Sequence, residues 1–278
     1  MSNTPEAILK QYFGYDTFRG GQRQAVDALL QGQDVLCVMP TGAGKSVCYQ
    51  VPAMALPGLT LVISPLISLM KDQVASLTRA GIPAAYLNSA LTDSQFRLAL
   101  SRMACGAYKI VYVAPERLSL DSFRELCARM DISLIAVDEA HCISQWGQDF
   151  RPDYLKIVDF IHALPKRPTV GAFTATATPE VAADITARLE LVSPQTVRTG
   201  FDRPNLFSPS SSPAARPMSC SPTSARTAAR AVSSTVPRAR RSSRSTKPSS
   251  APVSPPRATM RAFPRRSASR TRRISPLT

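Results

Sequence analysis

Short apolar, β-branched runs alternate with stretches of helical spacing over the first 207 residues, and this alternation limits the possible folds more than any other feature. We expect strands at residues 34–38, 59–64, 109–113, 132–138 and 169–174. We expect helices between them, for example at residues 22–30, 66–77, 93–104 and 179–189. Strands that alternate with helices pair in parallel, and the helices cover both faces of the sheet. The sequence therefore predicts one α/β domain over residues 1–207.

A glycine-rich loop follows the first expected strand, with the sequence Thr41-Gly42-Ala43-Gly44-Lys45-Ser46. Glycines in this pattern let backbone N–H groups approach phosphate oxygens, because no Cβ atom stands in the way. The lysine reaches the β and γ phosphates, and the hydroxyl of the following serine is offered to Mg²⁺. We predict that a nucleoside triphosphate is bound by Thr41, Gly42, Gly44, Lys45 and Ser46.

Two acidic residues, Asp138 and Glu139, follow the apolar run at residues 134–137. Asp138 is placed to hold the metal shell together with Ser46, partly through water, and Glu139 to orient or deprotonate the attacking water. The carboxyl ends of parallel strands lie at one edge of a sheet, where ligands of open α/β sheets bind. The two motifs together predict hydrolysis of the nucleotide, with Lys45, Asp138 and Glu139 in catalytic roles.

The chain has a net charge of +15, and all of this net charge comes from residues 208–278. This segment contains 14 Arg and 1 Lys but no Asp or Glu, whereas residues 1–207 contain 19 basic and 19 acidic residues. It also contains 18 Ser and 11 Pro and no Gly. Such a composition cannot bury enough apolar surface to offset chain entropy, so we expect a disordered basic tail after the globular domain.

Two origins are open for this tail. A natural basic arm would bind phosphate backbones without sequence preference. A shift of reading frame explains the composition better, because every tail residue except Lys247 has a codon whose middle base is not A. We therefore interpret residues 208–278 as the product of a frameshift.

Nothing in the sequence indicates export or a membrane. There is no signal peptide, and no apolar run approaches the roughly 20 residues that span a bilayer, so we expect a cytoplasmic protein. The 6 cysteines form no C-x-x-C pair, which favours reduced and mostly buried thiols over a zinc site or disulfides.

Seven motifs resemble, in this order, those of the RecQ family of ATP-dependent DNA helicases. They are FGYDTFRGGQ at 13–22, MPTGAGKSVCYQ at 39–50, SPLISLMKDQ at 64–73, APERL at 114–118, DEAHCISQWG at 138–147, FTATA at 173–177 and FDRPN at 201–205. The resemblance covers residues 5–207 and implies a RecA-like first motor domain, a P-loop NTPase with a DEAH box. A second RecA-like domain, a zinc module and a winged helix are expected beyond it, but the match ends at about Phe207.

The resemblance also implies roles for single residues around the nucleotide. Tyr15 is expected to stack on adenine, with Arg19 and Gln22 reading the base. His141 is expected to connect the nucleotide site to the motif at residues 173–177 through hydrogen bonds, as a further catalytic residue.

Contacts with DNA are implied at two places. Ser64 and Arg117 correspond to contacts with the phosphate backbone of a bound strand. A loop at residues 142–154 is expected to bind single-stranded DNA through Trp146, Phe150 and Arg151, with Tyr154 beside them. Stacking of bases on aromatic faces contributes about 1–3 kcal/mol per base and tolerates any sequence, which suits a translocating motor.

We therefore predict an ATP- and Mg²⁺-dependent, three-prime to five-prime DNA helicase domain of DNA repair and recombination, acting on single-stranded and partly duplex DNA. In the family, a second motor domain supplies an arginine finger worth about 10³–10⁵ in rate, so we expect this chain to be truncated and inactive in unwinding. One alternative is an RNA-directed ATPase of the same superfamily, which hydrolysis stimulated by DNA or by RNA would identify. The other is an ATP- and nucleic-acid-binding protein without motor activity, which would lose its DNA affinity on deletion of residues 208–278.

Overall fold

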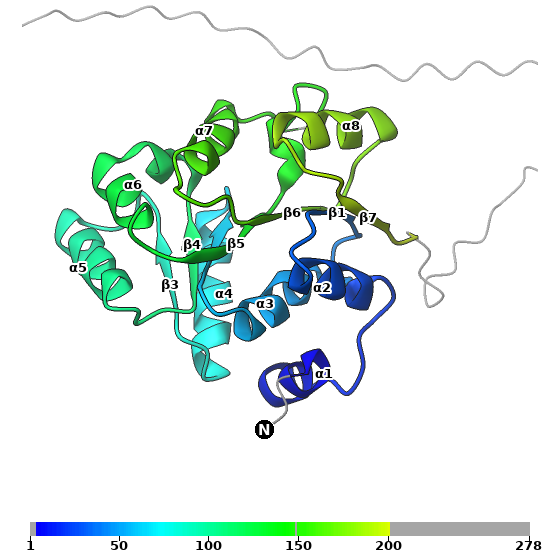
Figure 1. The fold of residues 1–278 in the computed structure, drawn as a ribbon, viewed down its shortest axis with the longest axis horizontal. Coiled ribbons are helices and arrows are strands. Elements are labelled where there is room, and N and C mark those ends of the chain that lie inside the picture. The colour runs from blue at the N-terminus through cyan, green and yellow to red at the C-terminus, as the bar shows by residue number, and fades with distance from the viewer. Residues whose placement is uncertain (1–3, 148, 201–278) are drawn as a thin grey trace, which may run out of the picture. The chain divides into compact units, whose positions relative to one another are not determined.

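A parallel sheet of 7 strands forms the centre of the computed structural model, which describes residues 4–147 and 149–200 (Figure 1). The strands lie in the order β3-β4-β2-β5-β6-β1-β7, and all paired neighbours are parallel. Their bounds are β1 Val35–Val38, β2 Leu59–Ile63, β3 Ala84–Leu87, β4 Ile110–Val113, β5 Ile132–Val137, β6 Thr169–Thr174 and β7 Gln195–Arg198. The predicted α/β fold is confirmed, while the expected tail and the motif at 201–205 lie outside the described residues.

Helices cover both faces of this sheet, with α2, α3 and α4 on one face and α5 to α8 on the other (Figure 1). The α-helices are α1 Pro5–Ile8, α2 Gln22–Leu30, α3 Lys45–Ala55, α4 Ile67–Arg79, α5 Asp93–Ala104, α6 Asp121–Cys127, α7 Lys156–His162 and α8 Pro179–Arg188. Short π- or 3₁₀-helical segments are η1 Leu9–Phe13, η2 Pro115–Ser119, η3 Ala140–Ile143 and η4 Pro152–Leu155.

Residues 134–137 of the central strand β5 form an uninterrupted apolar run. Successive side chains of a strand point to opposite faces of the sheet. Leu134 and Ala136 pack in the core under α2, α3 and α4, whereas Ile135 and Val137 pack in the core under α5 to α8. All four are fully buried. Helices on both sides of the sheet therefore bury both faces of this run, which explains why it is apolar throughout.

The two strands at the edges of the sheet, β3 and β7, have no pattern by which the sequence predicted a strand. β3 has mostly half-buried side chains, and in β7 only Val197 is buried. An edge strand pairs on one side and faces solvent on the other, so its residues do not form the apolar run by which the inner strands were recognised. The five inner strands begin and end within one residue of their predicted bounds.

Asp34 forms hydrogen bonds with several chain segments at the amino-terminal end of the sheet. Its carboxylate is 2% exposed and accepts backbone hydrogen bonds from Val170 of β6 (2.8 Å) and from Val192 just before β7 (2.8 Å). The two terminal nitrogens of Arg167 donate to its two oxygens at 3.2 and 2.6 Å. A single side chain in front of β1 thus connects the chain segments of three strands.

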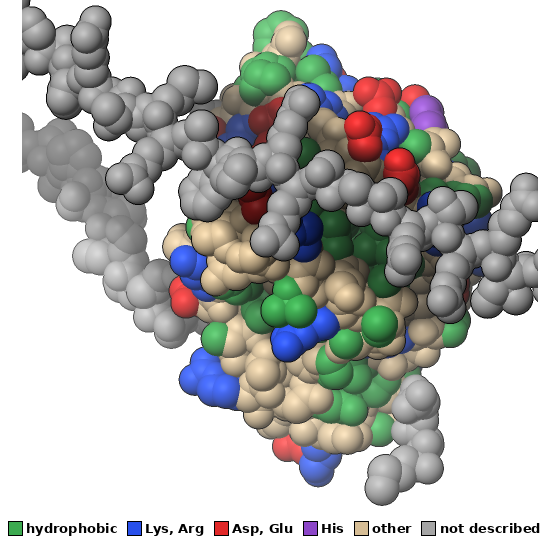
Figure 2. Space-filling model, turned by 90° about the vertical axis from the view of Figure 1, so that its left-hand side faces the viewer, with side chains coloured by type: hydrophobic (Ala, Val, Ile, Leu, Met, Phe, Trp, Pro, Cys, Tyr) green, Lys and Arg blue, Asp and Glu red, His purple; other side chains and the backbone are tan. Residues whose placement is uncertain are grey.

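The surface carries charges of both signs. Figure 2 shows acidic and basic side chains on the same face, with hydrophobic side chains between them. Within the described residues, no helix is long and apolar enough to cross a membrane.

The thiols follow the expectation from the sequence in most cases. The cysteines of the described chain are free, and all except the exposed Cys105 are buried. Cys220 lies outside the described residues.

Candidate active site

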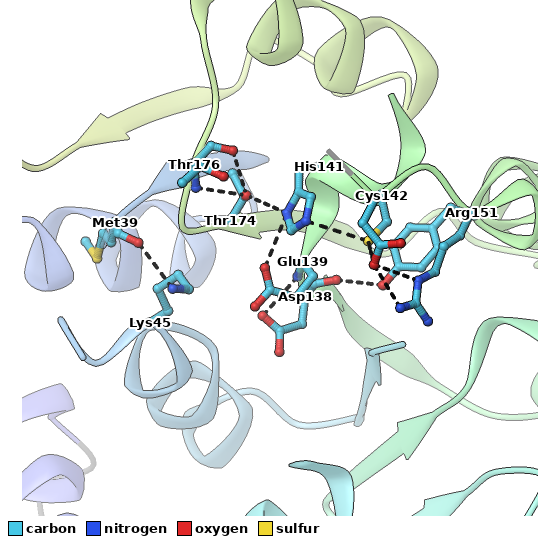
Figure 3. Close-up of polar contacts among 11 residues, drawn as sticks. Met39, Lys45, Asp138, Glu139, His141, Cys142, Arg151, Thr174 and Thr176 are labelled. Carbon is cyan, nitrogen blue, oxygen red and sulfur yellow. Dashed lines mark hydrogen bonds and ion pairs between the residues drawn. The ribbon is translucent and has the colours of Figure 1, made fainter. Parts of the chain in front are cut away.

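The glycine-rich loop connects β1 to α3 at the carboxyl edge of the sheet. Gly42 and Gly44 have φ angles of 85° and 81°, in the left-handed region that favours glycine. Lys45 begins α3, and its ammonium group donates to the Met39 carbonyl at 3.2 Å (Figure 3). Thr41 is exposed, and Ser46 lies half-buried in the first turn of α3. The loop therefore presents the start of a helix to the space in front of it, as an anion site requires.

Gln22 supports this loop from α2. Its amide nitrogen donates to the carbonyls of Ala43 (3.0 Å) and Gly44 (3.1 Å), and its amide oxygen accepts from the Arg19 backbone at 2.8 Å. The side chain is buried, and a Cβ atom at residue 44 would collide with it. The structure gives Gln22 a role in holding the loop that the sequence did not indicate. Its predicted contact with the base stays a prediction.

Tyr15 and Arg19 lie together near the loop. The guanidinium carbon of Arg19 is 5.5 Å from the centre of the Tyr15 ring, and the Tyr15 side chain is 48% exposed. A planar base could stack on either group, so the arrangement is compatible with the predicted role of this pair.

The two carboxylates follow β5, where Asp138 donates its backbone N–H to the Ile63 carbonyl of β2 at 2.8 Å. Burial and the neighbouring charge of Glu139 raise the pKa of Asp138 to about 6. Glu139 has a φ of 48°, a left-handed conformation that is strained for a residue with a side chain. Such strain is typical of functional sites, and it turns the Glu139 carboxylate toward His141 (Figure 3).

His141 connects these carboxylates to β6. Its Nδ1 atom lies 3.0 Å from the Thr174 hydroxyl and 3.3 Å from the Glu139 carboxylate (Figure 3). Interactions with the Cys142 thiol and with Glu139 raise the pKa of His141 to about 10, so the ring is a cation at neutral pH. The Thr174 hydroxyl in turn bonds both the backbone N–H and the carbonyl of Thr176. The hydrogen bond with Thr174 joins His141 to the motif at residues 174–176, while the catalytic role of His141 stays a prediction.

The aromatic residues of the segment after η3 differ in how exposed they are to solvent. Trp146 is 79% exposed and Phe150 is half-buried. Tyr154 is fully buried, and its hydroxyl donates to the Asp138 carbonyl at 2.8 Å. Tyr154 therefore belongs to the interior rather than to an aromatic surface for bases. Arg151, a predicted DNA contact, pairs with Asp149 at 2.8 Å.

Ser64 and Arg117 follow the neighbouring strands β2 and β4. The Ser64 hydroxyl is buried and has no hydrogen-bond partner among the described residues. The guanidinium of Arg117 lies 4.9 Å from the centre of the Phe96 ring and donates to the Asn88 carbonyl at 2.8 Å, but its Nε atom is unpaired within the described chain. Both atoms can still form a hydrogen bond, and the predicted contact of these two residues with a phosphate backbone stays a prediction.

Comparisons with known proteins agree with this geometry. A family model described as DEAD/DEAH box helicase matches residues 19–185. The ATP-dependent DNA helicase RecQ of Bacillus subtilis is 49% identical over 207 residues, which are 74% of this chain and 35% of that protein. The protein of the same name from Pasteurella multocida is 47% identical over 206 residues, 74% of this chain and 32% of that protein. The chain thus spans about a third of the length of these relatives.

The solved structures agree on the fold. A hypothetical ATP-dependent RNA helicase from Sulfolobus tokodaii superposes with a TM-score of 0.54 at 21% identity, covering 70% of this chain and 56% of that chain. At this identity, the likeness concerns the arrangement of the elements alone.

Proposed function

Because the chain belongs to the DEAD/DEAH box helicase family and is similar to its RecQ members, we propose that residues 1–207 are the ATP-binding first motor domain of a DNA helicase. The observation that carries this proposal is the position of Lys45 and Asp138 along one edge of the sheet. β1 precedes the glycine-rich loop, β5 precedes the carboxylates, and only β6 lies between these strands. Residues 208–278 are proposed as a separate basic tail.

The residues present suit ATP with Mg²⁺. Asp138 is a buried carboxylate beside a second carboxylate. Burial raises its pKa more than the positive charges of Lys45 and His141 lower it, and no salt bridge within the described residues joins it to a cation. A divalent metal would add positive charge next to the two carboxylates and, when bound, would neutralise charge on the phosphates. Ser46 and Asp138 are the proposed holders of that metal. Lys45 donates to the Met39 carbonyl just after β1, and this ammonium group is proposed to exchange that partner for a phosphate oxygen.

Glu139 is proposed to act on the attacking water. A hydrogen bond from His141 lowers the pKa of Glu139, so the carboxylate is ionised and can accept a proton. As water attacks the γ phosphorus, the bond to the β phosphate breaks and the water proton passes to Glu139, giving ADP and phosphate. His141 holds this carboxylate in place and connects it to Thr174.

A single strand of DNA is the proposed nucleic-acid partner. The unpaired atoms of Ser64 and Arg117 suit phosphate oxygens, and the exposed indole of Trp146 suits a base. Unwinding from three-prime to five-prime, also of partly duplex DNA, is proposed for the protein in which this domain works with a second RecA-like domain. A cytoplasmic location is proposed as well, because ATP and the chromosome are found there in bacteria such as the two named above.

Nucleotide binding is tested by titrating a fluorescent ATP analogue with Mg²⁺ into the wild type and Lys45→Ala. We expect the variant to bind at least about tenfold more weakly, since a charged hydrogen bond to phosphate contributes about 1.5–3 kcal/mol. Lys166→Ala removes an exposed lysine outside the site and should bind like the wild type. Equal affinities of Lys45→Ala and Lys166→Ala would refute the assignment.

DNA binding is tested with a fluorescent single strand. Trp146→Ala should weaken binding by about 5- to 150-fold, the equivalent of about 1–3 kcal/mol of stacking. Leu98→Ala, which also removes an exposed hydrophobic side chain, should not. Hydrolysis that RNA stimulates more than DNA would favour an RNA-directed motor, and nucleotide binding without any hydrolysis would favour a protein without motor activity.

A further inference from the structure

A pocket lies between η1, α3 and α4. Its volume is about 350 Å³, within the range of about 300–1,000 Å³ that is usual for sites of small molecules. Its lining residues are Tyr12, Phe13, Tyr15, Val47, Gln50, Gln73, Ser76, Leu77 and Ala80. Tyr15 is the only one of them that we assign to the nucleotide. Neither the phosphate-binding Lys45 nor the base-reading pair Arg19 and Gln22 belongs to this lining.

The lining residues indicate which shape and charge a ligand of this pocket must have. Three aromatic rings from η1 and the segment after it, those of Tyr12, Phe13 and Tyr15, face aliphatic side chains of α3 and α4. Flat rings stack favourably on aromatic side chains. None of the lining residues has a carboxylate, an ammonium or a guanidinium group, so a charged ligand would lose its hydration without gaining a partner. The pocket therefore suits a neutral, planar molecule.

Two glutamine amides provide the polar part of the pocket. Gln50 is 4% exposed, and its amide nitrogen donates to the Gln73 amide oxygen (3.0 Å) and to the Tyr112 hydroxyl (3.0 Å). Within the described residues, the amide oxygen of Gln50 and the amide nitrogen of Gln73 have no hydrogen bond. If both amides are turned over, one donor and one acceptor still remain. A ligand with an acceptor and a donor side by side would satisfy both.

We propose that this pocket is a separate binding site for a neutral lactam of two fused rings. A lactam carries a C=O acceptor next to an N–H donor on one edge of a flat ring, and the amide nitrogen of Gln73 and the amide oxygen of Gln50 offer it one donor and one acceptor. The rest of the molecule lies between the aromatic rings and the aliphatic side chains of the helices. The pocket shares Tyr15 with the proposed nucleotide site, but its polar groups, Gln50 and Gln73, are not assigned to the nucleotide.

The test uses the 278-residue chain and carbostyril, a neutral two-ring lactam, with binding measured by calorimetry or by ligand-observed NMR without nucleotide. We expect saturable binding in the micromolar to millimolar range. N-methylcarbostyril lacks the N–H donor and should bind several-fold more weakly, because a hydrogen bond typically contributes about 0.5–1.5 kcal/mol. Equal binding of the two compounds, or no saturable binding, overturns the proposal.

Variants then locate the site. Gln73→Leu should weaken binding of carbostyril about tenfold or more, and Ser76→Phe should abolish it by filling the pocket. Thr78→Phe, an exposed position of α4 that does not line the pocket, should bind like the wild type. A saturating ATP analogue should change the carbostyril affinity less than about threefold. If the ATP analogue displaces carbostyril, the pocket belongs to the nucleotide site and the proposal is overturned. If Lys45→Ala binds the ATP analogue as well as the wild type does, only the proposed function fails, and the carbostyril results still hold.

Discussion

Replacing Asp34 with alanine should lower the free energy of unfolding by about 3–5 kcal/mol, because two backbone N–H groups lose their charged acceptor. The contacts of this carboxylate account for that size. The buried backbone N–H of Val170 loses its acceptor, at a cost of about 1–3 kcal/mol, and the partly buried N–H of Val192 loses a hydrogen bond to a charged group, worth about 1.5–3 kcal/mol. The Arg167 side chain is 37% exposed and can turn toward water, so its part in the loss is small.

The measurement is urea unfolding followed by circular dichroism, with two controls. Arg167→Ala leaves both backbone hydrogen bonds of Asp34 in place and should cost at least about 1 kcal/mol less than Asp34→Ala. Asp72→Ala removes an exposed carboxylate of α4 and should change stability by less than about 0.5 kcal/mol. If Asp34→Ala is no more costly than Asp72→Ala, or if Arg167→Ala costs more than Asp34→Ala, the argument from the backbone contacts is wrong.

Three further changes test other contacts of the domain. Gly44→Ala places a Cβ atom against the Gln22 amide at a φ of 81°, so the affinity for an ATP analogue should fall at least about tenfold, and an unchanged titration would contradict this. Tyr154→Phe leaves the buried Asp138 carbonyl without its donor, and urea unfolding should show a loss of about 1–3 kcal/mol, whereas equal stability would make the hydroxyl dispensable. Lys109→Met removes an ammonium group that donates to three backbone carbonyls after the end of α3. The melting temperature of the variant should therefore be several degrees below that of the wild type, and an unchanged melting curve would contradict this.

Much of the fold was predictable because the inner strands and several helices have local patterns. α2 and α5 have the bounds that their spacing predicts, and α5 begins at a capping box between Thr92 and Gln95. The link between His141 and the Thr174 hydroxyl was predictable through the resemblance, because the motifs of that family place both residues at the same edge of the sheet.

The sequence by itself determined the order of strands and helices and the position of each motif after a strand. Those properties depend on near neighbours along the chain, through hydrophobic periodicity and the conformational freedom of glycine. Only the tertiary structure decided that Tyr154 faces inward to hold Asp138, and that Gln22 supports the glycine-rich loop. The pocket at Gln50 and Gln73 likewise exists only where η1, α3 and α4 meet. An aromatic ring or an amide can serve equally well inside or at the surface, and only the packing of distant segments decides which of these places it occupies.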